Sequence, residues 1–216
     1  MSLRQLLTYA QEDPALDALA EAARGQPQRA FVSSSLRPYL LAALADADPS
    51  RPALIVAGDD RQARDLAADL KQFLHPRPVR LYPSRGVRYE SHLAPPPHLV
   101  GLRIAALDAL LDQGSSDGGA AVVVAGAVAL AEKVPDPALR PHGFHVEKGE
   151  LLDLDETSAR LVACGYHRVD QVEERGQFAL RGDILDVYPA TEERAVRCEL
   201  FDVEVERLTF FSTFTQ

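Results

Sequence analysis

The residues with the greatest chemical potential lie together in the stretch ERGQFALRGDILDVYPA, residues 174–190. Arg175 and Arg181 each carry a planar guanidinium that can bind a carboxylate through two parallel hydrogen bonds. Phe178 and Tyr188 are aromatic, and arginine and aromatic side chains contribute most of the affinity at protein–protein interfaces. The stretch therefore favours a surface that binds another protein. The alternatives are a catalytic loop and a nucleic-acid-binding surface. The rest of the sequence decides among these three interpretations.

The sequence lacks the usual nucleotide-binding motif. A phosphate-binding loop has the pattern G-x-x-x-x-G-K-[ST], in which backbone amides surround the phosphates and the lysine reaches them. The corresponding turn here is VSSSLRPYLL (32–41), which has no glycine and no lysine, and its Pro38 removes an amide. The acidic run DLDET (153–157) looks like the acidic motif of an ATPase, but no buried apolar strand precedes it. We interpret it as a helix N-terminus, where carboxylates interact favourably with the helix dipole. We therefore predict that the chain is not an enzyme and uses no cofactor.

Metal-binding and nucleophilic patterns are also missing from the sequence. The six histidines are scattered, and His142 and His145 have no further ligands close by. Cys164 and Cys198 lack the spacing of zinc ligands, and we interpret them as reduced thiols. The G-x-S-x-G motif of serine hydrolases does not occur. We predict no catalytic residues and no metal site.

The charge of the chain is acidic and unevenly distributed. Its 216 residues carry a net charge of −9. Residues 1–142 hold 15 Lys and Arg against 16 Asp and Glu, a net of −1, whereas residues 143–216 hold 8 against 16, a net of −8. Because Lys and Arg supply nonspecific affinity for nucleic acid, we predict that DNA binding is weak or absent. No apolar run reaches the roughly 18 residues that span a bilayer, and no secretory signal is present, so we expect no membrane association and a cytoplasmic location.

The first part of the chain alternates strand patterns with helix patterns. Short strands are predicted at 29–32 and 79–83, and buried apolar strands at 53–57 and 120–126. The helix that follows the strand at 53–57 has Asp59 or Asp60 as its cap and repeats apolar residues at helical spacing. Strands that alternate with helices predict a parallel sheet flanked by helices.

The pattern changes after residue 134. The elements predicted there are a helix at 155–167 and strands at 169–174, 177–189 and 195–211. Asp155 or Thr157 is expected to cap the helix, and a hairpin turn is expected around Asp202. The predicted fold class is thus α/β followed by a smaller antiparallel α+β domain, with domain boundaries at 1–134 and 135–216.

Several segments resemble one family. YHRVDQVEERGQFALRGDILDVYPA (166–190) and VRCELFDVEVERLTFF (196–211) resemble the region that the bacterial transcription-repair coupling factor (Mfd) shares with the excision-repair helicase UvrB. The coupling factor is similar to the stretch LYPSRGVRYESHLAPPPHLVGLRIAALDALL (81–111). Both families are similar to the stretch RPALIVAGDDRQARDLAADLKQFL (51–74). UvrB has a working phosphate loop and this chain does not, so the coupling-factor family is the preferred interpretation.

The resemblance implies a degenerate helicase-like α/β domain (1–134) followed by a domain that binds UvrA (135–216). We therefore predict a non-catalytic docking module that recruits UvrA in transcription-coupled nucleotide excision repair. The alternative is a UvrB-like DNA-binding module of an excision-repair helicase. RNA polymerase is expected to bind only through parts of the family's chain that this sequence does not include, and we expect the sequence to be an N-terminal fragment.

Six residues are predicted to bind UvrA, namely Arg168, Arg181, Tyr188, Phe178, His167 and Arg175. Strand alternation puts Phe178 on one face and Ala179 and Arg181 on the other. Gly182 is expected to allow a bulge that re-aims Arg181, and Arg168 is expected near Arg181 on an adjacent strand.

Two other interpretations of this stretch remain open. Its aromatic and aliphatic residues can simply form the core, and Arg181 can form an internal ion pair with Glu173, Asp183 or Asp186. By resemblance, UvrB also has a further arginine at the position of Ala179, so this chain reproduces that surface only in part.

Overall fold

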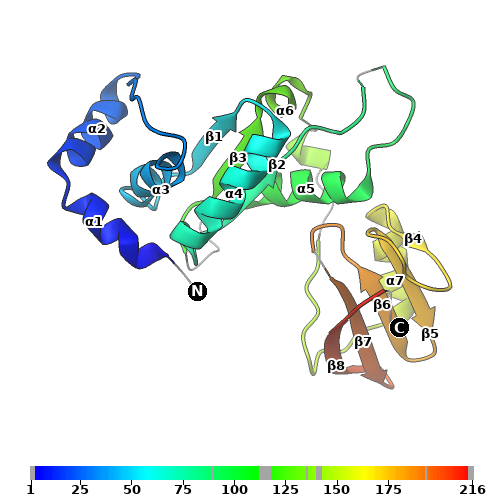
Figure 1. Cartoon of the computed structure of the whole chain (residues 1–216). Helices are drawn as coiled ribbons and strands as arrows, with labels where there is room; N and C mark the ends of the chain where they lie inside the picture. Colours follow the sequence, from blue (N-terminus) through cyan, green and yellow to red (C-terminus); the bar gives the residue numbers. More distant parts are fainter. Residues whose placement is uncertain are drawn as a thin grey trace. The chain divides into compact units, whose positions relative to one another are not determined.

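The computed structural model describes residues 3–88, 90–111, 118–134, 136–139, 143–192 and 194–213. The chain forms two compact units, shown in Figure 1. Unit 1 comprises Met1–Ala94 and Leu102–Glu132, and unit 2 comprises Pro95–Gly101 and Lys133–Gln216. The domain boundaries predicted at residues 134 and 135 stay a prediction. Among the described residues, no helix combines the length and the apolar character that crossing a membrane requires.

Unit 1 is built on a three-stranded parallel sheet with the strand order β1-β3-β2. The strands are β1 (Ala53–Ala57), β2 (Val79–Tyr82) and β3 (Val122–Gly126). The helices are η1 (Arg4–Leu6), α1 (Leu7–Gln11), α2 (Pro14–Gly25), α3 (Arg37–Asp46), α4 (Asp60–Leu74), α5 (Pro97–Leu111) and α6 (Ala127–Ala131). Helix α5 begins in unit 2 and continues into unit 1.

Helix α4 covers one face of this sheet (Figure 1). Asp59 caps the helix by accepting a hydrogen bond from the backbone N–H of Gln62 at 2.8 Å, as one of the two predicted caps. Its buried residues recur at helical spacing and are Ala63, Ala67, Leu70 and Leu74. They pack against Val122 and Val124 of the central strand, which is buried along its whole length. The predicted parallel sheet flanked by helices is therefore confirmed.

Strand β1 is covered on only one face. Leu54 and Val56 pair in register with Val123 and Ala125, which pack against Ala106 of α5 on the second face of the sheet. The cluster around α5 does not extend to β1, so Leu54 is 59% exposed and Val56 is 52% exposed. Their apolar character predicts a strand buried on both faces, and the described part of the chain supplies no neighbour for this side.

The strand predicted at 29–32 is absent, although these residues are described. They have no regular secondary structure, and the side chain of Phe31 is 94% exposed. A short apolar run forms a strand only where another strand offers a hydrogen-bonding edge and a core to pack against. The sequence shows the apolar run but not whether this edge exists.

Arg77 connects three segments of unit 1 from the inside. Its side chain is 3% exposed and donates hydrogen bonds to the backbone carbonyl groups of Ala45 (2.5 Å), Arg51 (2.6 Å) and Ala120 (2.6 Å). A buried carbonyl group that loses its hydrogen-bond donor destabilises the folded state, because it has also given up its hydrogen bonds to water. Arg77 is therefore a structural arginine whose guanidinium is buried inside the fold.

We expect the substitution Arg77→Met to lower the free energy of unfolding by about 3 kcal/mol, since three buried carbonyl groups lose a charged donor. The control Arg80→Ala removes an exposed arginine of β2 and should change stability by less than about 0.5 kcal/mol. Urea unfolding followed by circular dichroism measures both. Equal stability of the two variants would contradict the structural role of Arg77.

Unit 2 is built on a five-stranded sheet with the strand order β4-β5-β6-β7-β8. Strands β4 and β5 are parallel and the other neighbours are antiparallel. The elements are η2 (Pro137–Leu139), α7 (Leu154–Ala163), β4 (His167–Arg168), β5 (Gln177–Arg181), β6 (Ile184–Tyr188), β7 (Ala195–Phe201) and β8 (Glu204–Phe211). The smaller domain predicted as antiparallel α+β is confirmed, with β4 as its single parallel neighbour among the described strands.

Two turns decide how these strands connect. The predicted strand 177–189 is in fact a hairpin, because Gly182 adopts a φ of 59° and turns the chain between β5 and β6. Glycine takes up this left-handed conformation without a steric penalty, which explains why the turn lies there and why the predicted bulge was wrong. The turn predicted around Asp202 is confirmed, with a φ of 58° at that residue.

Two further sequence-based assignments in unit 2 were wrong. Asp153, not Asp155 or Thr157, caps α7, and its carboxylate accepts from the N–H groups of Asp155 and Glu156 at 2.9 Å. The strand predicted at 169–174 is shifted to His167–Arg168, which pairs with β5, and the N–H of Val169 adds one hydrogen bond to the carbonyl of Phe178. Apolar patterning locates such short elements to within a few residues, and hydrogen bonding fixes their ends.

Candidate functional site

The sheet of unit 2 has one face that forms a core. Phe178, Leu185, Cys198, Leu200 and Val205 are buried on this face and pack with residues of α7 and its preceding loop. The predicted strand alternation of Phe178 and Leu180 on one face, against Ala179 and Arg181 on the other, is consistent with this packing. The opposite side of the sheet, here called the open face, carries the polar residues.

Three strands contribute to the centre of the open face. Ala179 of β5 pairs with Asp186 of β6, and Asp186 pairs with Arg197 of β7. At the end of the β5–β6 hairpin, Arg181 pairs with Ile184. Because residues two apart on a strand point to the same side, these five side chains share the open face.

Asp186 lies at the middle of this group with its side chain fully buried. Its Oδ1 accepts a hydrogen bond from Nε of Arg197 at 2.7 Å, and its Oδ2 accepts from Nη2 of Arg197 at 2.8 Å and from Nη2 of Arg181 at 2.5 Å. The side chain of Arg181 is 45% exposed and that of Arg197 is 27% exposed. The carboxylate is thus internal, while both guanidinium groups reach the surface.

The charges of this cluster do not cancel. Burial by itself raises the pKa of Asp186, but hydrogen bonds and positive charges from Arg197 and Arg181 outweigh it, and the pKa lies below its ordinary value. The hydrogen bond to Asp186 raises the pKa of Arg197. These three groups by themselves carry a net charge of about +1 at neutral pH, and the negative charge of Glu199 also acts on Arg197. This local positive charge lies in a region of the chain, residues 143–216, whose net charge is −8.

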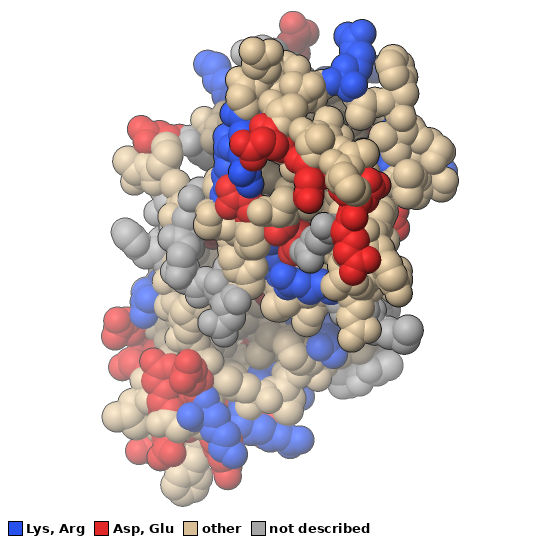
Figure 2. Space-filling model, turned by 90° about the vertical axis from the view of Figure 1, so that its left-hand side faces the viewer, with Lys and Arg blue, Asp and Glu red and all other residues tan. Residues whose placement is uncertain are grey.

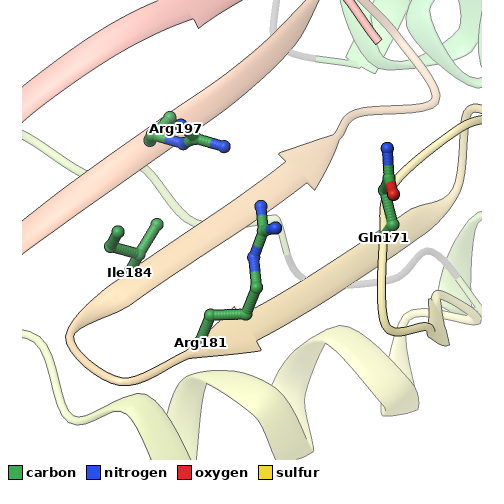
Figure 3. Close-up of a pocket in the computed structure, with 4 residues that line it drawn as sticks. All are labelled: Gln171, Arg181, Ile184 and Arg197. Carbon is green, nitrogen blue, oxygen red and sulfur yellow. The ribbon is translucent and has the colours of Figure 1, made fainter. Parts of the chain in front are cut away.

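A shallow pocket of about 400 Å³ opens beside the cluster. It is lined by Gln171, Arg181, Ile184 and Arg197. Figure 3 shows the guanidinium groups of both arginines directed toward the same space, with the amide of Gln171 at its border. Guanidinium and amide N–H groups beside an apolar side chain suit a carboxylate on a short aliphatic stem. Among the described residues, no group of His, Cys, Asp and Glu is arranged to hold a metal ion, and His142 lies outside them.

Four of the six predicted binding residues lie on or beside the open face. Arg181 forms one wall of the pocket. His167 pairs with Gln177, and Gln177 pairs with Tyr188, which places His167 and Tyr188 in one row across the open face. The guanidinium carbon of Arg175 lies 5.7 Å from the ring centroid of Tyr188, within the range of a cation–π interaction.

The other two predicted residues lie elsewhere. Phe178 is 0% exposed and belongs to the core, so its side chain supports β5 from below instead of offering a contact surface. Arg168 is exposed and pairs with Phe178, on the side opposite to Arg181. The expectation that Arg168 lies near Arg181 was wrong. Strand β4 meets only the beginning of β5, where Arg168 pairs with Phe178.

Sequence reasoning missed Arg197 and Gln171. Alternation within β7 can place Arg197 on the face opposite Cys198, but its contact with Asp186 depends on the register between β6 and β7. Gln171 lies in the loop after β4, inside the segment 169–174 that the sequence pattern wrongly predicts as a strand. Of the three internal partners considered for Arg181, Asp186 is the one that forms the ion pair.

Comparison with known proteins identifies this part of the chain. The family model described as the UvrB interaction domain matches residues 144–216, which include the five strands of the sheet and α7. Residues 144–216 are thus similar to the UvrB interaction domain, and this segment is called the interaction domain below. The pocket and all six predicted residues lie within this interaction domain.

Curated relatives extend the similarity into unit 1. The transcription-repair-coupling factor of Bacillus subtilis is 31% identical over 188 residues, which cover 87% of this chain and 16% of that protein. The UvrABC system protein B of Yersinia enterocolitica is 32% identical over 184 residues, which cover 78% of this chain and 27% of that protein. The predicted resemblance to both groups is confirmed, and the chain spans only 16% to 27% of the length of these relatives.

We expect Asp186→Asn to destabilise the interaction domain by about 2 kcal/mol at neutral pH, because two charged hydrogen-bonding partners lose their carboxylate. A depressed pKa in the fold means that the stabilisation is complete above the pKa of unfolded aspartate, about 3.9, and is lost as the pH falls through the lower folded value. The stability difference between the parent and the variant should therefore shrink in acid.

Urea unfolding at a series of pH values, with amide NMR signals of β6 and β7 as the probe, measures this difference. Asp183→Asn, in the exposed turn between β5 and β6, is the matched control and should show little effect at any pH. A stability difference that stays constant down to the acid limit would contradict the ionised state of Asp186.

Proposed function

We propose that this chain is a non-catalytic docking module that binds UvrA and recruits it in transcription-coupled nucleotide excision repair. The observation that carries the proposal is the half-exposed guanidinium of Arg181, held at the open face of the interaction domain by a buried carboxylate. Arginines fixed in this way lose little conformational entropy when they bind a partner, and such residues are typical interface hot spots.

The assignment to the coupling-factor side of the family is supported by unit 1. The stretch VSSSLRPYLL (32–41) contains the turn before α3 and the start of that helix, and it has no glycine or lysine where the loop of UvrB would enclose nucleotide phosphates. Helix α3 starts at Arg37 with Pro38 in its first turn and no side-chain cap. These features favour a module that docks a repair protein without binding ATP.

The competing function is a UvrB-like module that binds DNA. Figure 2 shows acidic and basic side chains interspersed on one side of the molecule, with no extended basic area among the described residues that it displays. The net charge of −9 also opposes binding to phosphates. Binding to a protein is therefore the function that the surface supports better.

Arg181→Ala should weaken the affinity for purified UvrA by about 30-fold, which corresponds to about 2 kcal/mol. Arg181→Lys should restore only part of the affinity, because an ammonium group cannot make a planar two-pronged contact. The control Lys148→Ala removes the same charge from an exposed site of unit 2 and should leave the affinity unchanged. Calorimetry or surface plasmon resonance gives the dissociation constants.

Thermal unfolding of the same samples separates docking from stability. If Arg181 acts only as an internal partner of Asp186, the alanine variant will unfold at a lower temperature and bind UvrA as tightly as the parent. That combination would remove Arg181 from the interface.

Duplex DNA should bind weakly, and the binding should disappear at physiological salt, because few Lys and Arg residues are available to release counterions. Fluorescence anisotropy with a labelled duplex at increasing salt measures this. A submicromolar complex that persists at high salt would support the DNA-binding alternative.

A further inference from the structure

We infer that the tip of the β7–β8 hairpin is a second interaction surface, which binds an arginine side chain of a partner protein against the ring of Phe201 and the carboxylate of Glu204. The surface consists of Leu151, Phe201, Val203 and Glu204 and is here called the tip surface. It shares no residue with the arginine pocket, the pocket that Arg181 lines. The inference goes beyond the proposed function, because it depends on neither UvrA nor Arg181.

Backbone pairing on two sides holds the tip surface in place. Glu204 pairs with Phe201 of β7 on one side, and on the other side Leu151 forms a bridge with it, where the segment before α7 runs beside β8 (Figure 1). The N–H of Leu152 donates a hydrogen bond to the carbonyl of Val203 at 2.7 Å, which fixes the turn as well. The side chains of the tip surface therefore start from defined backbone positions.

Phe201, Glu204 and Leu151 form a row on the solvent side of the sheet. Residues directly opposite each other in paired strands share a face. Their neighbours along the chain point the other way and are buried in the core, namely Leu152, Leu200 and Val205. Phe201 is 76% exposed and Leu151 is 72% exposed, so a partner that covers them gains free energy from the burial of apolar surface.

Phe201 lacks the arginine that covers other rings of unit 2. In four pairs, a guanidinium carbon lies 4.0 to 5.7 Å from an aromatic ring centroid, and these pairs are Arg160–Phe144, Arg175–Tyr188, Arg194–Phe210 and Arg197–Phe211. Phe201 is the most exposed aromatic residue in the described part of unit 2, and no described arginine stacks on it. Its ring is thus open to a guanidinium from another protein.

Glu204 adds the charge that such a guanidinium requires. Its carboxylate forms no ion pair and no hydrogen bond with any residue that the structure describes. Cβ atoms of directly opposite residues are about 5 Å apart, so one guanidinium can reach both the ring of Phe201 and this carboxylate. Asp202 and Glu150 are acidic and exposed beside the row. The tip surface therefore attracts a cation, whereas the arginine pocket attracts an anion.

The shape of the row favours arginine over lysine as the partner side chain. A guanidinium is planar, so it can lie flat on the ring of Phe201 while its N–H groups point at the carboxylate of Glu204. An ammonium group has no flat face and cannot make both contacts in the same way. Leu151, on the other side of Glu204, can contact an apolar residue next to the arginine in the partner.

The overall charge favours a different protein over a second copy of this chain. Residues 143–216 carry a net charge of −8 and the whole chain carries −9. Two copies would bring these like charges together, whereas a basic segment would be attracted. The partner is therefore a protein segment that presents an arginine beside an apolar residue.

Peptide titration of the whole chain, followed by backbone amide NMR signals, tests the inference. The probe is the peptide Ac-Leu-Arg-Leu-NH2, and the signals of Leu151, Phe201, Val203 and Glu204 should shift saturably. The lysine peptide Ac-Leu-Lys-Leu-NH2 should bind more weakly, and Ac-Leu-Glu-Leu-NH2 should leave these signals in place. No saturable shift with the arginine peptide, or equal binding of all three peptides, would overturn the inference.

Two variants remove the proposed contacts singly. Phe201→Ser and Glu204→Gln should each weaken the arginine peptide by about threefold or more, as expected for one exposed cation–π contact or one exposed ion pair. Both side chains are exposed, so neither change disturbs the core. The control Glu156→Gln removes a carboxylate from an exposed position of α7 and should have no effect. Equal affinities of Glu204→Gln and Glu156→Gln would contradict a defined site.

Two further measurements identify the occupant and separate the two surfaces. The tip signals should stay in place when the concentration of the chain alone is raised, and a shift would assign the site to a second copy and overturn the inference. Arg181→Ala, which should weaken the affinity for UvrA, should bind the arginine peptide as the parent does. Loss of peptide binding in that variant would show that the tip surface is not separate from the arginine pocket.

Discussion

The buried carboxylate of Asp186 determines how the open face of the interaction domain is organised. It sits in the middle strand of a row that runs from Ala179 through Asp186 to Arg197. On the open face, the small side chain of Ala179 leaves room over β5 for the arginine side chains. Arg197 reaches Asp186 from β7, the neighbour of β6 on its other side. The tight turn at Gly182 sets the pairing of β5 with β6, and a slip of one residue would turn Asp186 into the apolar core. The turn, the register and the ion pairs therefore depend on one another.

The two units use arginine in contrasting ways. Arg77 of unit 1 is almost fully enclosed and donates hydrogen bonds to three backbone carbonyl groups. In the interaction domain, Arg181 and Arg197 share one buried carboxylate and keep part of each guanidinium at the surface. Guanidinium surface thus remains accessible to a partner only in the second case. This difference, more than the number of arginines, separates a residue that holds a fold together from one that can recognise a partner.

Sequence patterns were sufficient for features that depend on neighbours along the chain. Alternation placed Phe178 and Arg181 on opposite faces, helical spacing and capping located α4, and Asp202 marked a hairpin turn. Features that depend on contacts across strands were out of reach. The partnership of Arg197 with Asp186 requires the register of β6 and β7, and the position of Arg168 requires that of β4 and β5. The run at 29–32 lacks a neighbouring strand edge in the described structure, a condition that no local pattern expresses.

The uncovered side of β1 has a consequence for the behaviour of the chain in solution. Leu54 and Val56 face water on an outer strand of the sheet, and no described strand uses the backbone donors and acceptors along its free edge. A strand with these properties acts as a template onto which other polypeptides can add. This edge can therefore promote self-association at high protein concentration, and none of its residues lines the arginine pocket. Charged substitutions at Leu54 or Val56 are accordingly the rational way to improve solubility without altering the docking chemistry of the interaction domain.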